Sequence, residues 1–177
     1  MDDFSTRLSQ LQETIIAAAK RAGRNPSDIE LDVTELVLAR STLTQNGVLE
    51  DLRQLGVRIA IDNFGAQYSS LDYLRNYRVS RLKIARGMVA AADAEPGGGA
   101  MIRAILSLAR ELGIEVLAEG VETESQCRLL VDASAHAQGQ GFYFSHAVSA
   151  EDTINMLRTG VMMPAEGEAP ASNQDLE

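Results

Sequence analysis

Apolar and polar residues alternate with a period of two over residues 57–62, where Val57, Ile59 and Ile61 are separated by charged or small residues. This period is typical of a β-strand. Gly65 follows shortly afterwards and allows the chain to turn sharply. The segment therefore predicts a buried strand that ends in a turn, and the rest of the chain is arranged around it.

Related patterns predict four more strands, at residues 29–35, 79–84, 114–120 and 139–144. Between the strands, apolar residues recur every three or four positions, as in helices that bury one face. The predicted helices cover residues 5–22, 45–55, 70–77, 101–112, 123–133 and 149–157. Thr123 and Gln126 form a capping box at the start of one of them. The glycine-rich segment 90–99 is predicted to be a loop.

This alternation of strands and helices predicts an α/β fold in which parallel strands are covered by helices. About five strands are visible in the pattern, which is too few for a closed eight-stranded barrel of about 250 residues. We expect one domain over residues 1–163. The segment 164–177 has the composition of a disordered tail.

The charge and the composition of the chain limit the kinds of molecule that it can bind and the compartment in which it works. The chain has 177 residues, a formal net charge of −9 and a pI near 4.7, which argues against nucleic acid or an anionic membrane as the main partner. No apolar run approaches the roughly 20 residues of a membrane span. Cys127 is the single cysteine, so an internal disulfide is excluded and a reducing cytoplasm is the expected compartment.

Ionisable residues stand at or near the carboxyl ends of four predicted strands: Asp32, Asp62, Lys83 and Glu119. In a parallel sheet these ends face the same way, so the side chains could converge on one site. Three carboxylates and a lysine suit a hard cation such as Mg²⁺ or Mn²⁺, which lowers the pKa of a bound water. The same spacing would also arise if each acid faced solvent or capped the next helix.

Several motifs carry a resemblance to a known family. They are Leu31–Glu35 (LDVTE), residues 62–71 (DNFGAQYSSL), 82–86 (LKIAR), 118–123 (AEGVET) and 140–145 (QGFYFS). Together they resemble, in order, the C-terminal two-thirds of an EAL domain, the family of bacterial cyclic-di-GMP phosphodiesterases. The resemblance implies a partial TIM-like barrel that lacks its N-terminal strand–helix units. It also implies cleavage of cyclic di-GMP to pGpG with two divalent metal ions.

The resemblance assigns roles to individual residues. Asp62 matches a metal-bridging aspartate, and Lys83 matches the lysine that contacts the attacking water. Glu119 matches a glutamate at the metal site. Glu122 and Gln140 match residues of the substrate pocket. In addition, Glu35 matches a glutamate that braces the loop after the acidic pair.

Other positions depart from the family pattern. No suitable Glu-Ala-Leu signature occurs in the sequence. Asp32 stands where the family has a metal-binding glutamate, and Asn63 replaces the second aspartate of the acidic pair. Ala85 replaces an acid, and His146 stands where an arginine is usual. Changes among direct ligands weaken metal sites strongly, so we expect Mg²⁺ or Mn²⁺ not to bind tightly.

These features predict a degenerate, truncated EAL-like signalling domain that is catalytically inactive and acts as a regulatory or protein-interaction module. One alternative is a cyclic-di-GMP phosphodiesterase that becomes active when the missing N-terminal half is supplied. Another is a receptor that binds cyclic di-GMP without cleaving it. Because an open sheet leaves two unpaired edges, we also expect a protein partner or a second copy of the chain to cover them.

Overall fold

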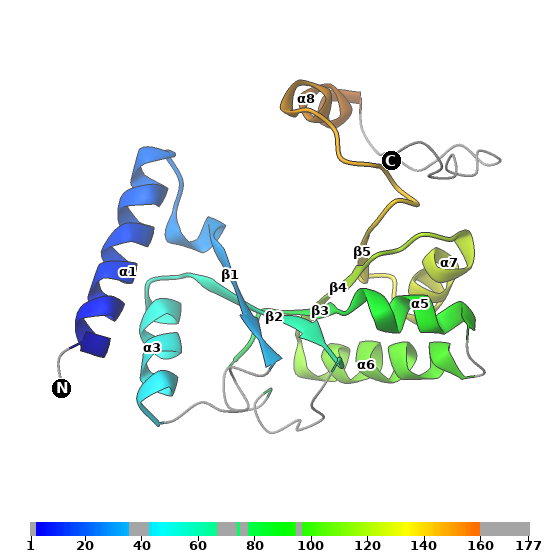
Figure 1. Cartoon of the computed structure of the whole chain (residues 1–177), viewed down its shortest axis with the longest axis horizontal. Helices are drawn as coiled ribbons and strands as arrows, with labels where there is room; N and C mark the ends of the chain where they lie inside the picture. Colours follow the sequence, from blue (N-terminus) through cyan, green and yellow to red (C-terminus); the bar gives the residue numbers. More distant parts are fainter. Residues whose placement is uncertain (1–2, 36–42, 67–73, 75–77, 95–96, 160–177) are drawn as a thin grey trace, which may run out of the picture. The chain divides into compact units, whose positions relative to one another are not determined.

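The computed structural model describes residues 3–35, 43–66, 74, 78–94 and 97–159 (Figure 1). Its elements are α1 (Asp3–Arg21), the 3₁₀-helix η1 (Pro26–Asp28), β1 (Glu30–Thr34), α3 (Leu43–Gln54), β2 (Arg58–Phe64), β3 (Arg81–Ile84), α5 (Arg86–Ala94), α6 (Gly98–Leu112), β4 (Glu115–Glu119), α7 (Glu124–Ala133), β5 (Gln138–Gln140) and α8 (Ala150–Thr159). The chain divides into two compact units. The first comprises Met1–Lys83 with Leu112–Glu115, and the second comprises the remainder.

The strands form a five-stranded sheet in the order β1-β2-β3-β4-β5. Strands β1 and β2 are parallel, with Glu30 opposite Arg58 and Thr34 opposite Asp62. Strands β4 and β5 are also parallel. The predicted α/β sheet of about five strands is therefore confirmed. Within the described part of the chain the strand order is linear, so β1 and β5 are its edges.

The first unit has a core of alternating strand residues. Ile59 and Ile61 of β2 and Leu82 of β3 are fully buried, as the two-residue period predicts. Helix α3 packs against β2 and buries Leu52. The segment Leu112–Glu115 also belongs to this unit, and the backbone nitrogen of Glu115 donates to the carbonyl oxygen of Ser80 over 3.1 Å. This core fixes the strands that carry the charged residues discussed below.

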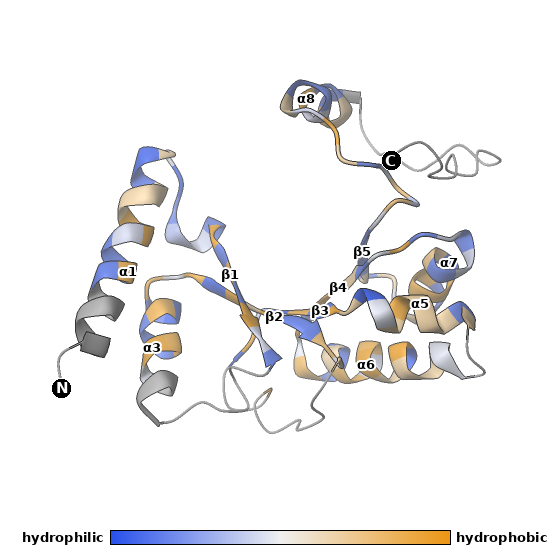
Figure 2. Cartoon of the chain, viewed as in Figure 1, coloured by the Kyte–Doolittle hydropathy of each residue, from blue (hydrophilic) through white to orange (hydrophobic). Residues whose placement is uncertain are grey.

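The second unit is built on α5, α6 and α7. The apolar face of α6 is buried and consists of Ile102, Ile105, Leu106 and Ala109, as the helical period predicts. Figure 2 shows these apolar stretches of α6 in orange. Helix α7 packs against α5, and it begins with the predicted capping box. There the backbone nitrogen of Gln126 donates to Thr123 Oγ1 (3.2 Å), and that of Thr123 donates to Gln126 Oε1 (3.1 Å).

Some boundaries differ from the sequence prediction. Helix α5 occupies part of the segment predicted to be a loop, and α6 begins at Gly98, earlier than expected. The last strand is Gln138–Gln140, whereas Phe142, Tyr143 and Phe144 lie in a turn. Most of the helix predicted at 70–77 and the tail predicted at 164–177 lie outside the described residues.

None of the helices in the described ranges is long and apolar enough to cross a bilayer.

Candidate functional site

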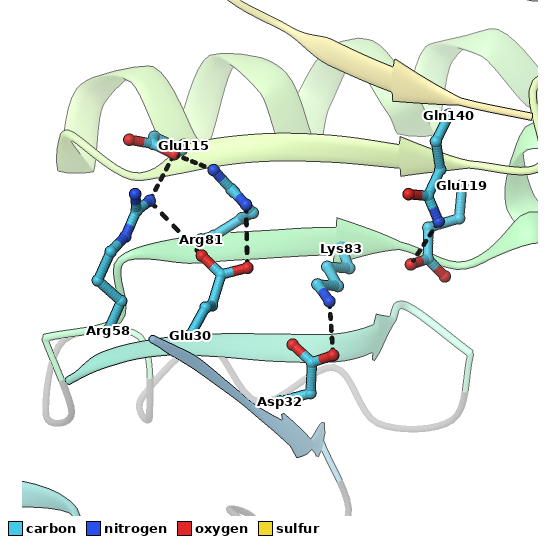
Figure 3. Close-up of polar contacts among 8 residues, drawn as sticks. All are labelled: Glu30, Asp32, Arg58, Arg81, Lys83, Glu115, Glu119 and Gln140. Atoms are coloured by element: carbon cyan, nitrogen blue, oxygen red, sulfur yellow. Dashed lines mark hydrogen bonds and ion pairs between the residues drawn. The ribbon is translucent and has the colours of Figure 1, made fainter. Parts of the chain in front are cut away.

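An ion pair joins the first and third strands. Lys83 Nζ donates to Asp32 Oδ2 over 2.6 Å (Figure 3). The Lys83 side chain is 14% exposed and the Asp32 side chain 47% exposed. Strand β2 lies between β1 and β3, and the small residue Ala60 is opposite Asp32 in the register. The pair therefore neutralises a carboxylate that the resemblance assigns to a metal.

Asp62 and Asn63 are hydrogen-bonded to each other at the end of β2. The Asp62 carboxylate accepts from the backbone nitrogen of Asn63 (2.9 Å) and from Asn63 Nδ2 (3.0 Å). Asn63 adopts a left-handed backbone conformation, with φ of 54°, which asparagine tolerates better than most residues. The amide side chain thus donates to the acid beside it instead of adding a second negative charge.

The first unit also contains a buried carboxylate, that of Glu35. It is 3% exposed, and its Oε2 accepts from the backbone nitrogen of Gly65 over 3.3 Å. Gly65 lies in the turn after β2 and has a φ of 86°. This contact joins the end of β1 to the turn after β2, and the loop-bracing role of Glu35 stays a prediction.

The second unit holds the remaining predicted site residues. Gln140 Nε2 donates to Glu119 Oε1 over 3.3 Å, so β5 and β4 present an amide and a carboxylate side by side (Figure 3). Glu122 is paired with Arg86, whose Nη2 lies 2.5 Å from Glu122 Oε1. Each predicted substrate residue therefore has a defined polar partner.

A divalent metal requires several oxygen or nitrogen ligands at one point. Among the described residues, no group of three or more His, Cys, Asp or Glu side chains is placed to hold a metal ion. Asp32 is engaged by an ammonium group, and Asn63 turns its amide toward Asp62. The described donors therefore do not fit a two-metal centre as they are arranged.

The structure also brings together charged residues that the sequence analysis did not select. Glu30, Arg58, Arg81 and Glu115 form an ion-pair network at the amino-terminal ends of the strands (Figure 3). A signal for it exists in the sequence, because each residue opens a strand in the same two-residue phase as the strand-end charges. Arg58, for example, precedes Asp62 by four positions, and side chains four apart share a face of a strand.

Cys127 and His146 have well-defined surroundings in the second unit. Cys127 is buried in α7, and burial raises the pKa of its thiol, which fits a packing residue rather than a nucleophile. His146, which replaces the usual arginine, stacks on Phe142 with ring centroids 4.5 Å apart. The ring thus supplies an aromatic surface where the family pattern has a guanidinium group.

Comparison with known proteins gives the family. The family model for the EAL domain matches residues 3–147 of the chain. The chain belongs to the EAL domain family. The parallel α/β sheet is accordingly part of a TIM-like barrel fold, and the solved structures below, which are EAL domains, support the same conclusion.

The bifunctional diguanylate cyclase/cyclic di-GMP phosphodiesterase MucR of Pseudomonas aeruginosa is 36% identical over 144 residues, which are 81% of this chain and 21% of MucR. The solved PaMucR phosphodiesterase in complex with c-di-GMP has a TM-score of 0.74 and 36% identity. The match covers 81% of this chain and 57% of that one. The EAL domain of Mycobacterium smegmatis DcpA has a TM-score of 0.76 and 33% identity, with 86% and 67% covered. The chain thus spans about a fifth of MucR.

Proposed function

We propose that the chain acts in signalling as a catalytically inactive EAL-family module that regulates or binds other proteins. The observation that carries this proposal is the 2.6 Å ion pair between Lys83 and Asp32. A carboxylate held by a lysine has its charge satisfied, so a metal ion would have to displace the ammonium group. The lysine would likewise have to leave its partner before it could orient a water molecule.

The acidic pair supports the same proposal. Asn63 contributes an amide where the family pattern has an acid, and that amide donates to Asp62. Affinity for hard divalent ions depends on the number of charged oxygen ligands. Asp62 supplies one such charge at the end of β2 and Asn63 supplies none, so we propose that Mg²⁺ or Mn²⁺ binds weakly there.

A second candidate is a receptor that binds cyclic di-GMP without cleaving it. The observation in its favour is that the predicted substrate residues Glu122 and Gln140 both belong to the second unit, where Gln140 lies opposite Glu119 in the register of β4 and β5. The solved PaMucR structure is itself a c-di-GMP complex. The third candidate is a cyclic-di-GMP phosphodiesterase. In it, Lys83 and Glu119 act once another polypeptide supplies the rest of the barrel.

The decisive experiment incubates the purified chain with cyclic di-GMP in Mg²⁺ or Mn²⁺ and measures pGpG by liquid chromatography. We expect no turnover above a metal-free control. A matched variant, Asp32→Glu with Asn63→Asp, restores the two acids of the family pattern. Turnover by the unmodified chain would overturn the proposal, and turnover only by the variant with an added N-terminal half would favour the third candidate.

Binding is measured separately by titration calorimetry with cyclic di-GMP in the presence of EDTA. Saturable binding that is lost in Glu122→Gln and Gln140→Ala would establish the receptor function. If titration with cyclic di-GMP at high micromolar concentration releases no heat of binding, the receptor function is excluded and the protein-interaction role is favoured.

For that interaction role, we propose that a partner protein or a second copy covers the edges β1 and β5. Analytical ultracentrifugation of the chain tests for self-association. We propose further that residues 1–163 act as one domain in the cytoplasm.

A further inference from the structure

A hollow lined by charged residues lies in the first unit, at the amino-terminal ends of the strands. It is a cavity of about 480 Å³ lined by Arg24, Ser27, Asp28, Glu30, Arg58 and Arg81. Asp32 and Lys83 lie further along β1 and β3, toward the carboxyl ends where the expected catalytic chemistry is placed. The cavity therefore belongs to the opposite end of these strands.

Two guanidinium groups are held in place by acids at this end. Arg81 Nη1 lies 2.9 Å from Glu30 Oε1, and Arg81 Nη2 lies 2.6 Å from Glu115 Oε2. Arg58 Nη2 lies 2.6 Å from the same Glu115 oxygen. Guanidinium groups fixed in this way present their remaining N–H groups in a set direction.

The hydrogen-bond donors exceed the acceptors that these contacts use. Each arginine carries five N–H donors, whereas three side-chain hydrogen bonds join Arg58 and Arg81 to their acids. Arg81 Nε is buried and has no hydrogen-bond partner among the described residues. A buried donor of this kind calls for an acceptor.

The acids on the wall are already engaged. Glu30 accepts from Arg81, and Asp28 accepts from the backbone nitrogen of Asn25 over 3.2 Å. Three arginines and two acids line the cavity, and Glu115, which pairs with Arg58 and Arg81 outside the lining, balances the third arginine. The wall is therefore rich in hydrogen-bond donors rather than in net charge. Ser27 adds a neutral hydroxyl to the same wall.

We propose that this cavity binds a small oxyanion with two or more negative charges, such as a phosphate-bearing or polycarboxylate metabolite. Planar guanidinium groups pair with both chemistries through two parallel hydrogen bonds. Arg58 and Arg24 supply N–H donors for the ligand, and the ion pairs of Arg81 with Glu30 and Glu115 hold the other guanidinium group in place. The inference does not depend on the proposed function, because none of these residues belongs to the EAL motifs at the carboxyl ends.

The test uses the full chain, with pyrophosphate and citrate as probes at constant ionic strength and NaCl as the reference salt. We expect saturable binding by calorimetry and a saturable rise in melting temperature with at least one probe. Pyrophosphate alone would identify a phosphate ligand, and citrate alone a carboxylate ligand. Failure of both probes to act beyond NaCl would overturn the proposal.

Variants decide whether the cavity is the site. Arg24→Ala removes an exposed guanidinium group from the wall, and we expect it to weaken binding about tenfold. Ser27→Glu places a negative charge there and is expected to abolish binding. Arg110→Ala, on α6 and outside the cavity, makes the same charge change as Arg24→Ala. If Arg110→Ala lowers the affinity for the probe as much as Arg24→Ala does, the effect is one of general charge and the proposal is wrong. Circular dichroism checks that each variant is folded.

Discussion

Lys83 Nζ and Asp32 Oδ2 are 2.6 Å apart, although the two residues belong to strands separated by β2. Their side chains meet where Ala60 is the residue opposite Asp32. A methyl group at that position leaves room for a lysine side chain to reach over the strand. The contact therefore depends on a small residue in β2 as much as on the two charges.

The Lys83–Asp32 pair should contribute measurably to stability. In a double-mutant cycle of Lys83→Met and Asp32→Asn, we expect a coupling energy of about 1–2 kcal/mol, because the lysine side chain is mostly shielded from water. Urea denaturation of the four proteins measures it.

The matched control is the pair Arg128–Glu124 on the surface of α7, with side chains 75% and 60% exposed. Its coupling should be about 0.3–0.5 kcal/mol. If both cycles give the same small value, the Lys83–Asp32 pair is an ordinary surface pair and would not keep a metal ion from Asp32.

The backbone at Asn63 should decide which substitutions the turn tolerates. Its φ of 54° is left-handed, so Asn63→Ala should lower the free energy of unfolding by about 1 kcal/mol, whereas Asn63→Gly should be close to neutral. Thermal denaturation compares the two. Among the described residues Arg78, with a φ of 43°, is also left-handed, and Arg78→Gly provides a comparison. An alanine as stable as the glycine would contradict the backbone explanation.

A close backbone crossing should make Gly141 sensitive to any side chain. A Cβ there would lie 2.2 Å from the carbonyl oxygen of Val121 and 2.3 Å from its nitrogen. We expect Gly141→Ala to cost more than about 2 kcal/mol, because backbone atoms would have to move. In Gly87→Ala, by contrast, no atom lies within 4 Å of the added Cβ. This helical control should be neutral or stabilising by about 0.5–1 kcal/mol, and a similar loss in both variants would refute the prediction.

The ion-pair network should make stability depend on pH through Glu115. Hydrogen bonds from Arg81 and then Arg58 hold the pKa of Glu115 below its usual value. A carboxyl whose pKa is lower in the folded state stabilises the fold above its unfolded pKa of about 4.3 and loses that contribution as the pH falls through the folded pKa. Wild type should therefore exceed Glu115→Gln in melting temperature most clearly above pH 5, and the difference should shrink toward pH 3.

Glu111→Gln provides the control for that experiment. Glu111 pairs with Arg110 over 3.5 Å, and both side chains are exposed. We expect this variant to differ little from wild type at any pH. A difference for Glu115→Gln that does not change with pH would show that packing, and not charge, explains the effect.

Helices and strands could be predicted where the periodic pattern of apolar residues extends over many positions. The apolar face of α6 and the burial of Ile59 and Ile61 in β2 follow from the spacing of their side chains, whereas Ala60 and Phe64 are buried out of that phase. Helix α5 was missed because its only buried side chain is Val89, so no apolar stripe marks it. The last strand was placed too late because Phe142–Phe144 is apolar, yet the backbone nitrogen of Phe144 bonds back to Gly141 O and makes a turn.

The candidate site was predictable only in part. The acids and the lysine at the strand ends stand out in the sequence, and so does the exchange of an acid for Asn63. Their partners do not. The resemblance assigns Asp32 to a metal, which stays a prediction, and only the structure shows that Asp32 pairs with Lys83. The sequence did not point to the network at the amino-terminal ends, because its four residues are the first residues of their strands and lie outside the family motifs.

By itself, the sequence determined the alternation of strands and helices, the buried faces and the family motifs, because each of these is a local pattern of side chains. Only the tertiary structure decided which charges meet. Lys83 and Asp32 are 51 residues apart, and Arg58 and Glu115 are 57 apart. Such contacts depend on strand order and register, which bring distant positions together and are not encoded in any short stretch of the chain.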